Sequence, residues 1–127
     1  MIKKEIVTAF LTLATSGKVR EAYEKYIHPD FRHHNPYFKG DRESLLIGME
    51  ESGKEFPNKT YEAVRAIEEG DLVAVHGRVR LSPDMPEIAL MHIFKFKDDL
   101  IIDEWEAAQE VPKECPNENG FLIETKE

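Results

Sequence analysis

The hydrophobic pattern of this chain changes its period once, near Pro57, and that change limits the folds open to it. Before this point, apolar residues recur every three or four positions, as they do on the buried face of a helix. From Thr60 onward they alternate with polar residues, which is the period of a half-buried strand. Helices grouped before strands predict an α+β domain in which the helices pack on an antiparallel sheet.

Three helices are expected before the change of period. The first runs from about residue 3 to residue 16, and Gly17 can end it in a left-handed conformation. A second carries the apolar positions of residues 19–27 and stops before Pro29, because proline disfavours a helical conformation in the residue before it. Asp41 has the side chain and the position to cap the start of a third.

Strands are expected in the rest of the chain. A short extended piece, residues 31–35, comes before the third helix. The later strands are separated by turn residues and cover residues 60–68, 72–81, 87–97 and 100–111. Because so few helices cannot cover both faces of this sheet, one face should meet the helices and the other should meet solvent or another subunit.

Length, charge and cysteine content exclude several classes of protein. The 127 residues fit one domain, 1–127, whose residues 112–127 form a C-terminal tail. A net charge of −8 repels nucleic acid and anionic membrane surfaces, so neither is expected as a partner. Cys115 is the only cysteine, which favours a reducing, cytoplasmic location. No apolar run approaches the length of a membrane span, and the apolar residues after Lys4 have helical spacing rather than that of a signal peptide.

The hairpin between the last two strands decides which side chains share a face. A two-residue loop at 98–99 would place His92 and Glu106 on opposite faces, whereas a three-residue loop would place them together. We favour the three-residue loop because both faces then remain largely apolar. One face would hold His92, Glu104 and Glu106 with Leu90, Phe94, Phe96 and Ile102, and the other Met91, Ile93, Ile101, Trp105 and Ala107.

Such a face would favour proton transfer. A carboxylate such as Glu106 loses hydration among apolar side chains, so its pKa should rise toward neutrality. His92 would add a second group that titrates in the same range. A base and a nearby donor are what proton removal next to a carbonyl requires. A histidine and a glutamate that meet across a hairpin are also a common structural contact, and the spacing alone leaves both interpretations open.

Three groups of residues follow one another in the order and spacing of a known family. They are Tyr26-Ile27-His28-Pro29-Asp30-Phe31 with His34-Asn35-Pro36; His92-Ile93-Phe94-Lys95 with Asp98-Asp99 and Asp103-Glu104-Trp105-Glu106; and Val111-Pro112 with Asn119-Gly120-Phe121. Over nearly its whole length the chain resembles the SnoaL-like family, the polyketide-cyclase-like branch of the nuclear-transport-factor-2-like superfamily. The third group is similar to one branch of the family that is predicted to catalyse aldol condensation.

The resemblance implies a cone: N-terminal helices packed on a strongly curved antiparallel sheet that encloses an internal pocket. It also implies a homodimer through the outer face of the sheet, and no metal or organic cofactor. By the same resemblance Glu106 is the acid/base, in place of the family's aspartate, and His92, fourteen positions earlier, assists it. Asp99 replaces the usual glycine of the turn, and aspartate tolerates a left-handed conformation.

Further residues are expected to bind the substrate: Phe31, His34, Asn35, His76, Leu90, Phe94 and Glu104. The resemblance places His34 in the pocket, although a satisfied structural histidine is an equal alternative. His76 lies on a mixed face, which fits either a pocket wall or a wet edge of the sheet. No metal site is expected at His33 and His34, because adjacent residues of an extended segment point to opposite sides.

These observations favour one function and leave others open. The first hypothesis is a cofactor-independent enzyme of the cyclase, isomerase or lyase type. It would catalyse an intramolecular aldol-type condensation, or a related proton transfer, on a small hydrophobic carbonyl compound. The alternative is a non-catalytic module that binds a small ligand on the same scaffold. A hydrolase in which Glu106 activates water is a third.

Overall fold

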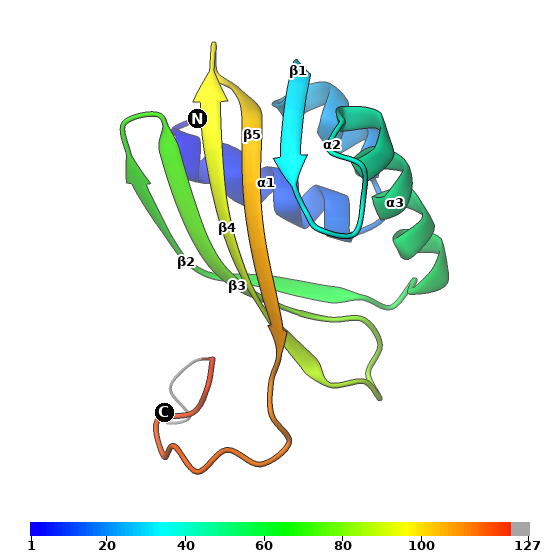
Figure 1. Cartoon of the computed structure of the whole chain (residues 1–127), viewed down its shortest axis with the longest axis vertical. Coiled ribbons are helices and arrows are strands. Elements are labelled where there is room, and N and C mark those ends of the chain that lie inside the picture. The colour runs from blue at the N-terminus through cyan, green and yellow to red at the C-terminus, as the bar shows by residue number, and fades with distance from the viewer. Residues whose placement is uncertain (123–127) are drawn as a thin grey trace.

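The computed structural model describes residues 1–122, and it has the predicted α+β architecture. Three helices precede most of the sheet, and all five strands belong to one curled sheet (Figure 1). The elements are α1 (Lys3–Thr15), α2 (Val19–Tyr26), β1 (Ile27–His34), α3 (Arg42–Glu55), β2 (Thr60–Glu69), β3 (Leu72–Arg80), β4 (Glu87–Lys97) and β5 (Leu100–Glu110). Within the described residues, no helix has both the length and the apolar character needed to cross a membrane.

The helix ends follow the local sequence, with one exception. Gly17 has a φ of +95° after α1, and the backbone N–H of Ser44 donates to the Asp41 carboxylate at the start of α3, 3.1 Å away. The prediction that α2 continues to the residue before Pro29 is wrong. Ile27 already has an extended backbone and pairs with Ile101 of β5, so pairing in the sheet overrides the helical pattern.

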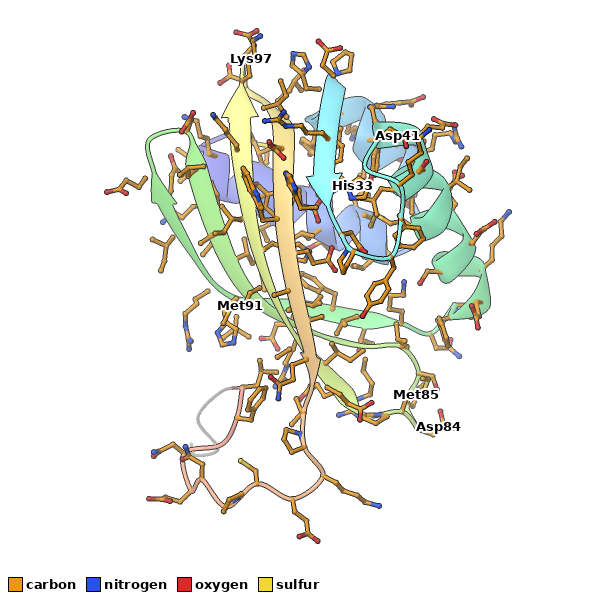
Figure 2. All side chains as sticks on the ribbon, viewed as in Figure 1. His33, Asp41, Asp84, Met85, Met91 and Lys97 are labelled. Carbon is orange, nitrogen blue, oxygen red and sulfur yellow. The ribbon has the colours of Figure 1, made fainter. Side chains whose placement is uncertain are left out.

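The strands follow the order β1-β5-β4-β3-β2. Neighbouring strands run antiparallel, except that the edge strand β1 is parallel to β5. The turn after Lys97 lies at one end of the sheet, and the loop of Asp84 and Met85 lies at the other (Figure 2). His33 of β1 lies close to the start of α3, since its N–H donates to the carbonyl of Gly40 (Figure 2).

Aromatic side chains fill the space between the helices and the sheet near the β4–β5 turn. The ring of Phe10 from α1 lies 5.6 Å from that of Tyr23 and 6.1 Å from that of Phe94, measured between centroids. All three side chains are at most 2% exposed. These side chains fill the cone near the β4–β5 turn, so the space that remains open inside it lies farther from this turn.

The β4–β5 turn has two residues. Lys97 pairs with Leu100, so only Asp98 and Asp99 stand between the strands, and the predicted three-residue loop is wrong. Both aspartates have a positive φ, 54° and 64°. Two successive residues of this kind form the turn whose twist matches that of an antiparallel pair.

A bulge in β5 restores the register that the shorter turn would have lost. Phe96 pairs with Ile101, whereas the next pair is Lys95 with Asp103, so Ile102 is an extra residue. From Asp103 onward, each residue of β5 has the facing that a three-residue loop would have produced. The bulge therefore supplies the missing residue at a different place.

The faces of β5 are consequently those predicted, except near the turn. His92, Glu104 and Glu106 share the inner face, as expected. Ile101 and Ile102 have exchanged sides relative to the prediction, because they precede the point at which the register is restored. Ile101 is fully buried in the core, and Ile102 lies beside a surface groove.

Candidate functional site

A cavity of about 230 Å³ lies between helices α1 and α3 and the inner face of the sheet. Its wall is largely apolar, with side chains such as Phe10, Met49 and Leu90. Titratable groups interrupt this wall on two neighbouring strands, where β4 contributes His92 and β5 contributes Glu104 and Glu106. A small apolar enclosure with a few convergent polar groups has the character of a ligand site.

The three titratable side chains meet at one point. The Nε2 atom of His92 lies 3.5 Å from Oε2 of Glu104 and 3.6 Å from Oε1 of Glu106. Asn35, at the end of β1, donates a hydrogen bond from Nδ2 to the same oxygen of Glu106 at 3.1 Å. His92 and Glu104 are buried, at 6% and 4% exposure, whereas Glu106 is partly open to the cavity.

Glu104 holds a proton at neutral pH. Burial raises the pKa of its carboxyl to about 8, and the neighbouring charge of Glu106 acts in the same direction, against the opposing effect of His92. The carboxyl groups of Glu104 and Glu106 also hydrogen bond to each other. A protonated carboxylic acid beside a carboxylate is a hydrogen-bond donor.

Glu106 has the opposite tendency. Burial would raise the pKa of its carboxyl, but the nearby His92, together with Glu104 and the amide of Asn35, outweighs burial and lowers it. The prediction that Glu106 carries the raised pKa is therefore wrong, and the raised value belongs to Glu104. Two carboxyl groups this close cannot both ionise easily, and the one with more donors around it keeps the charge.

His92 faces the carboxylates through one nitrogen only. Burial lowers the pKa of its imidazole. Glu106 and Glu104 raise this pKa by more than burial lowers it, so the net result is a raised pKa. Its ring stacks on that of Phe94 with centroids 5.3 Å apart. Within the described residues, the buried Nδ1 atom has no hydrogen-bond partner. Nε2 is therefore the nitrogen of His92 that faces the two glutamates.

The same cluster has the spacing of a metal site. One ligand atom from each of His92, Glu104 and Glu106 lies within 4.8 Å of the others. The imidazole nitrogen and the two carboxylates are donors that a divalent transition metal accepts. His33 and His34, the adjacent histidines of β1, point to opposite sides as expected, since His33 is buried and His34 is exposed.

The cavity contains only some of the predicted substrate-binding residues. Asn35, Leu90 and Glu104 line it. Phe31 and Phe94 do not: they are 3% and 0% exposed and belong to the aromatic core. They belong to the apolar packing between helices and sheet and are not part of the cavity wall.

Two predicted pocket histidines lie outside the cavity. His34 stacks on Trp105, with ring centroids 5.0 Å apart, and its Nε2 atom lies 3.1 Å from the Asp103 carboxylate. His76 faces the outer side of β3, and Arg65 lies 2.9 Å from its Nδ1 atom. Strand alternation explains both corrections. Neighbouring residues of a strand point to opposite faces, and here the buried side chains are those of His33 and Val75, so His34 and His76 point outward.

Sequence reasoning missed four polar residues of the cavity wall, one of which is Thr15 at the end of α1. Lys59 and Tyr61 line it from the start of β2, and Ser52 lines it from α3. Lys59, immediately before β2, and Tyr61 are separated by one residue and so share a face, which is a signal that the alternating pattern contained. Ser52 gave no such signal, since it lies among charged residues of α3 that read as a solvated surface.

Residues 7–104 match the family model described as SnoaL-like domain. None of the curated protein sequences matches the chain. Among solved structures, the putative polyketide cyclase IdmH from Streptomyces antibioticus is 20% identical, with a TM-score of 0.70 over 85% of this chain and 92% of that one.

Two other solved structures are similar to this chain. The putative hydroxylase AclR from Streptomyces galilaeus is 17% identical, with a TM-score of 0.72 over 84% of this chain and 88% of that one. A putative SnoaL-like polyketide cyclase from Jannaschia Sp. CCS1 is 19% identical, with a TM-score of 0.65 over 84% of both. At these identities the structures establish the fold, and the match over residues 7–104 establishes the family. The chain belongs to the SnoaL-like domain family.

Proposed function

We propose that this protein is an enzyme of the cyclase or isomerase type that moves protons on a small carbonyl compound. The observation that carries the proposal is geometric: Nε2 of His92 lies within 3.6 Å of both Glu104 and Glu106 on the wall of a largely apolar cavity, and the surroundings of the two carboxyl groups differ. Glu104 has a pKa raised to about 8, whereas that of Glu106 is lowered. Paired titratable groups whose surroundings drive their pKa values apart are typical of a general acid and a general base.

In the proposed mechanism, Glu106 is the base. Its carboxylate takes a proton from a carbon next to the carbonyl of the substrate, and the C–H electron pair moves onto the carbonyl oxygen as an enolate. Glu104 keeps its proton at neutral pH and donates a hydrogen bond to this oxygen. His92 contacts both carboxyl groups through Nε2 and balances the charge of Glu106.

Two continuations follow from the enolate. If the substrate has a second carbonyl within reach, the enolate carbon attacks it, a C–C bond forms, and the resulting alkoxide takes the proton from Glu104 or His92. If it has instead a carbon–carbon double bond conjugated with the enolate, Glu106 returns its proton to the far carbon of the resulting dienolate, the double bond shifts, and an isomer results. Positioned proton transfer typically contributes about a hundred- to ten-thousand-fold in rate, and holding two reacting groups of one molecule together contributes more.

One observation favours the alternative of a non-catalytic ligand-binding module. A carboxylate whose pKa is lowered is a weak base toward carbon acids. In the proposed enzyme, an apolar substrate that displaces solvent from the partly open side of Glu106 offsets this weakness, because further burial raises the pKa of a carboxyl. In a binding module the cluster would instead only hydrogen bond to a ligand.

Proton exchange at carbon separates the two. The protein is incubated in deuterium oxide with a panel of small diketones and enones, and loss of the α-proton signals is followed by NMR. We expect Glu106→Gln to lose at least about a hundredfold in exchange rate. Glu51→Gln, on the exposed side of α3, is the matched control. Unchanged exchange in Glu106→Gln would overturn the proposed base.

We further propose a homodimer through the outer face of the sheet. This face carries large apolar side chains that are unusually exposed for their type: Ile67 at 66%, Met91 at 54%, Ile93 at 44%, Leu72 at 40% and Trp105 at 38%. The strand register makes several of them neighbours, since Ile93 pairs with Trp105 across β4 and β5. A contiguous apolar face of this kind is typical of a protein–protein interface.

A further inference from the structure

Lys59 is a cation on the wall of an otherwise acidic and apolar cavity. It lies immediately before β2, and its ammonium donates a hydrogen bond to Oγ of Ser52 in α3 at 2.7 Å. Among the described residues that line the cavity, it is the only lysine or arginine. An ammonium group has three donors, and within residues 1–122 only this one hydrogen bond engages its side chain.

The charge of Lys59 is not balanced by a carboxylate. Within the described residues, no salt bridge includes it. Burial alone accounts for its lowered pKa, with no contribution from Glu104 or Glu106. The ammonium and the acidic cluster therefore occupy separate parts of one cavity. A half-buried cation without a counter-ion is costly, and a negatively charged ligand group would offset that cost.

The wall beside Lys59 offers a second donor. Tyr61 lies two residues further along β2 and also lines the cavity. Burial raises the pKa of its phenol to about 12, so it stays protonated. Its hydroxyl oxygen is buried, and no hydrogen-bond partner for it occurs in the part of the chain that the structure describes. Buried hydroxyls are normally paired. This one packs against Gly77, where an added Cβ would lie 2.6 Å from the oxygen, so it donates to a ligand only when the Tyr61 ring turns toward the cavity.

We propose that the substrate is a keto acid whose carboxylate binds Lys59 Nζ and Ser52 Oγ, while its ketone lies at the Glu104–Glu106–His92 cluster. This inference rests on the proposed function and names its substrate class. The apolar wall between the two polar places takes a hydrocarbon body. With a net charge of −8, the protein as a whole repels anions, so a carboxylate needs a local cation to bind here.

The recognition step is tested with aryl keto acids of two chain lengths, benzoylpropionate and benzoylbutyrate, and with their methyl esters. Each acid and its ester differ mainly in charge. Isothermal titration calorimetry measures the dissociation constants for the wild type and for Lys59→Met. We expect at least one acid to bind the wild type more tightly than its ester. In Lys59→Met that acid should lose about ten- to a hundredfold in affinity, because hydrogen bonds to charged groups are strong, while the ester is unaffected.

Two further variants separate charge from fold. Lys59→Arg keeps the cation and should retain most of the preference for the acid. Lys54→Met removes an exposed lysine of the last turn of α3 and should change nothing. Equal losses for acid and ester in Lys59→Met, or acids that bind no more tightly than esters in the wild type, would overturn the proposal.

The neutral esters make its failure distinguishable from that of the proposed function. They carry the same ketone and the same exchangeable α-protons as the acids. If they exchange these protons in a Glu106-dependent way but bind as tightly as the acids, only the role of Lys59 fails. If neither acids nor esters exchange, the proposed proton transfer fails, and the preference for the acid still reports on Lys59.

Discussion

His92 and Glu106 stand directly opposite each other on β4 and β5, with Nε2 of the imidazole 3.6 Å from Oε1 of the carboxylate. The turn that joins the two strands has only two residues, which by itself would place these side chains on opposite faces. The extra residue at Ile102 restores their pairing. The geometry of the acidic cluster thus depends on the bulge at Ile102, which lies between the turn and Glu104 in the sequence.

The turn next to this bulge leads to the first prediction. Asp99 has a φ of 64°, a conformation that glycine adopts at lower cost than aspartate. We expect Asp99→Gly to raise the free energy of unfolding by about 0.5–1 kcal/mol. Urea denaturation measures this change. Asp71→Gly, in the β2–β3 turn, is the control, because the φ of Asp71 is not positive and the same gain should be missing. No gain for Asp99→Gly would contradict the left-handed turn.

The pH dependence of stability provides the second prediction. Glu104 has a pKa near 8 in the folded protein, against an ordinary value of 4.5, and the pKa of His92 is raised above 6.5. Between about pH 4.5 and pH 8 the folded state therefore binds more protons than the unfolded state, and the free energy of unfolding falls as pH rises. We expect thermal unfolding to occur at a lower temperature near pH 9 than near pH 6.

Glu104→Gln isolates this effect. The amide is uncharged at every pH, so the variant should lose less stability than the wild type between about pH 6 and pH 9. Glu106 acts in the opposite direction: its lowered pKa contributes stability above about pH 4.5 that is lost as pH falls through its folded value. Scanning calorimetry measures the first effect between about pH 6 and pH 9 and the second below about pH 4.5. Parallel profiles for the wild type and Glu104→Gln would contradict the raised pKa of Glu104.

Asn35 provides the third prediction. Its amide donates to the Glu106 carboxylate at 3.1 Å and is one of the hydrogen bonds that lower the pKa of this group. Asn35→Ala removes the donor, so the pKa of Glu106 should rise. An NMR titration of the glutamate carboxyl carbons measures the change. Asn58→Ala, in the exposed loop before β2, is the control and should leave the titration of Glu106 as it is.

The outer sheet face provides the fourth prediction. If two copies associate through it, a charge at its centre should separate them. We expect Trp105→Glu to change the mass in solution from that of a dimer to that of a monomer, measured by light scattering after gel filtration. Ile47→Glu, at an exposed position of α3 with 42% exposure, should leave the dimer intact. A wild-type protein that is monomeric at all concentrations would contradict the proposed interface.

The sequence predicted the fold more successfully than the site. Period and capping located the helices, and alternation located the strands, because both patterns reflect which side of an element is buried. The end of α2 was misplaced because pairing of Ile27 with β5 is a tertiary effect that no local pattern contains. The parallel pairing of β1 with β5 was not predicted for the same reason.

The errors at the site have a physical pattern. The pairing of His92 with Glu106 was predicted correctly from an incorrect loop, since the missing residue lies at Ile102 rather than in the turn. His34 and His76 were misplaced by one position in alternation. The raised pKa was expected at Glu106 and belongs to Glu104, because burial dominates at Glu104, whereas His92 and, to a smaller extent, Asn35 lower the pKa of Glu106.

The most direct test of the account is a titration of the two glutamates in the intact protein. Carbon-13 NMR of the side-chain carboxyl carbons follows them, with Glu104→Gln and Glu106→Gln used for assignment. We expect one signal, from Glu104, to titrate at about 8, and the signal of Glu106 to titrate below its ordinary value of 4.5. If both glutamates titrate together near 4.5, the cavity holds no acid–base pair and the proposed proton transfer is wrong.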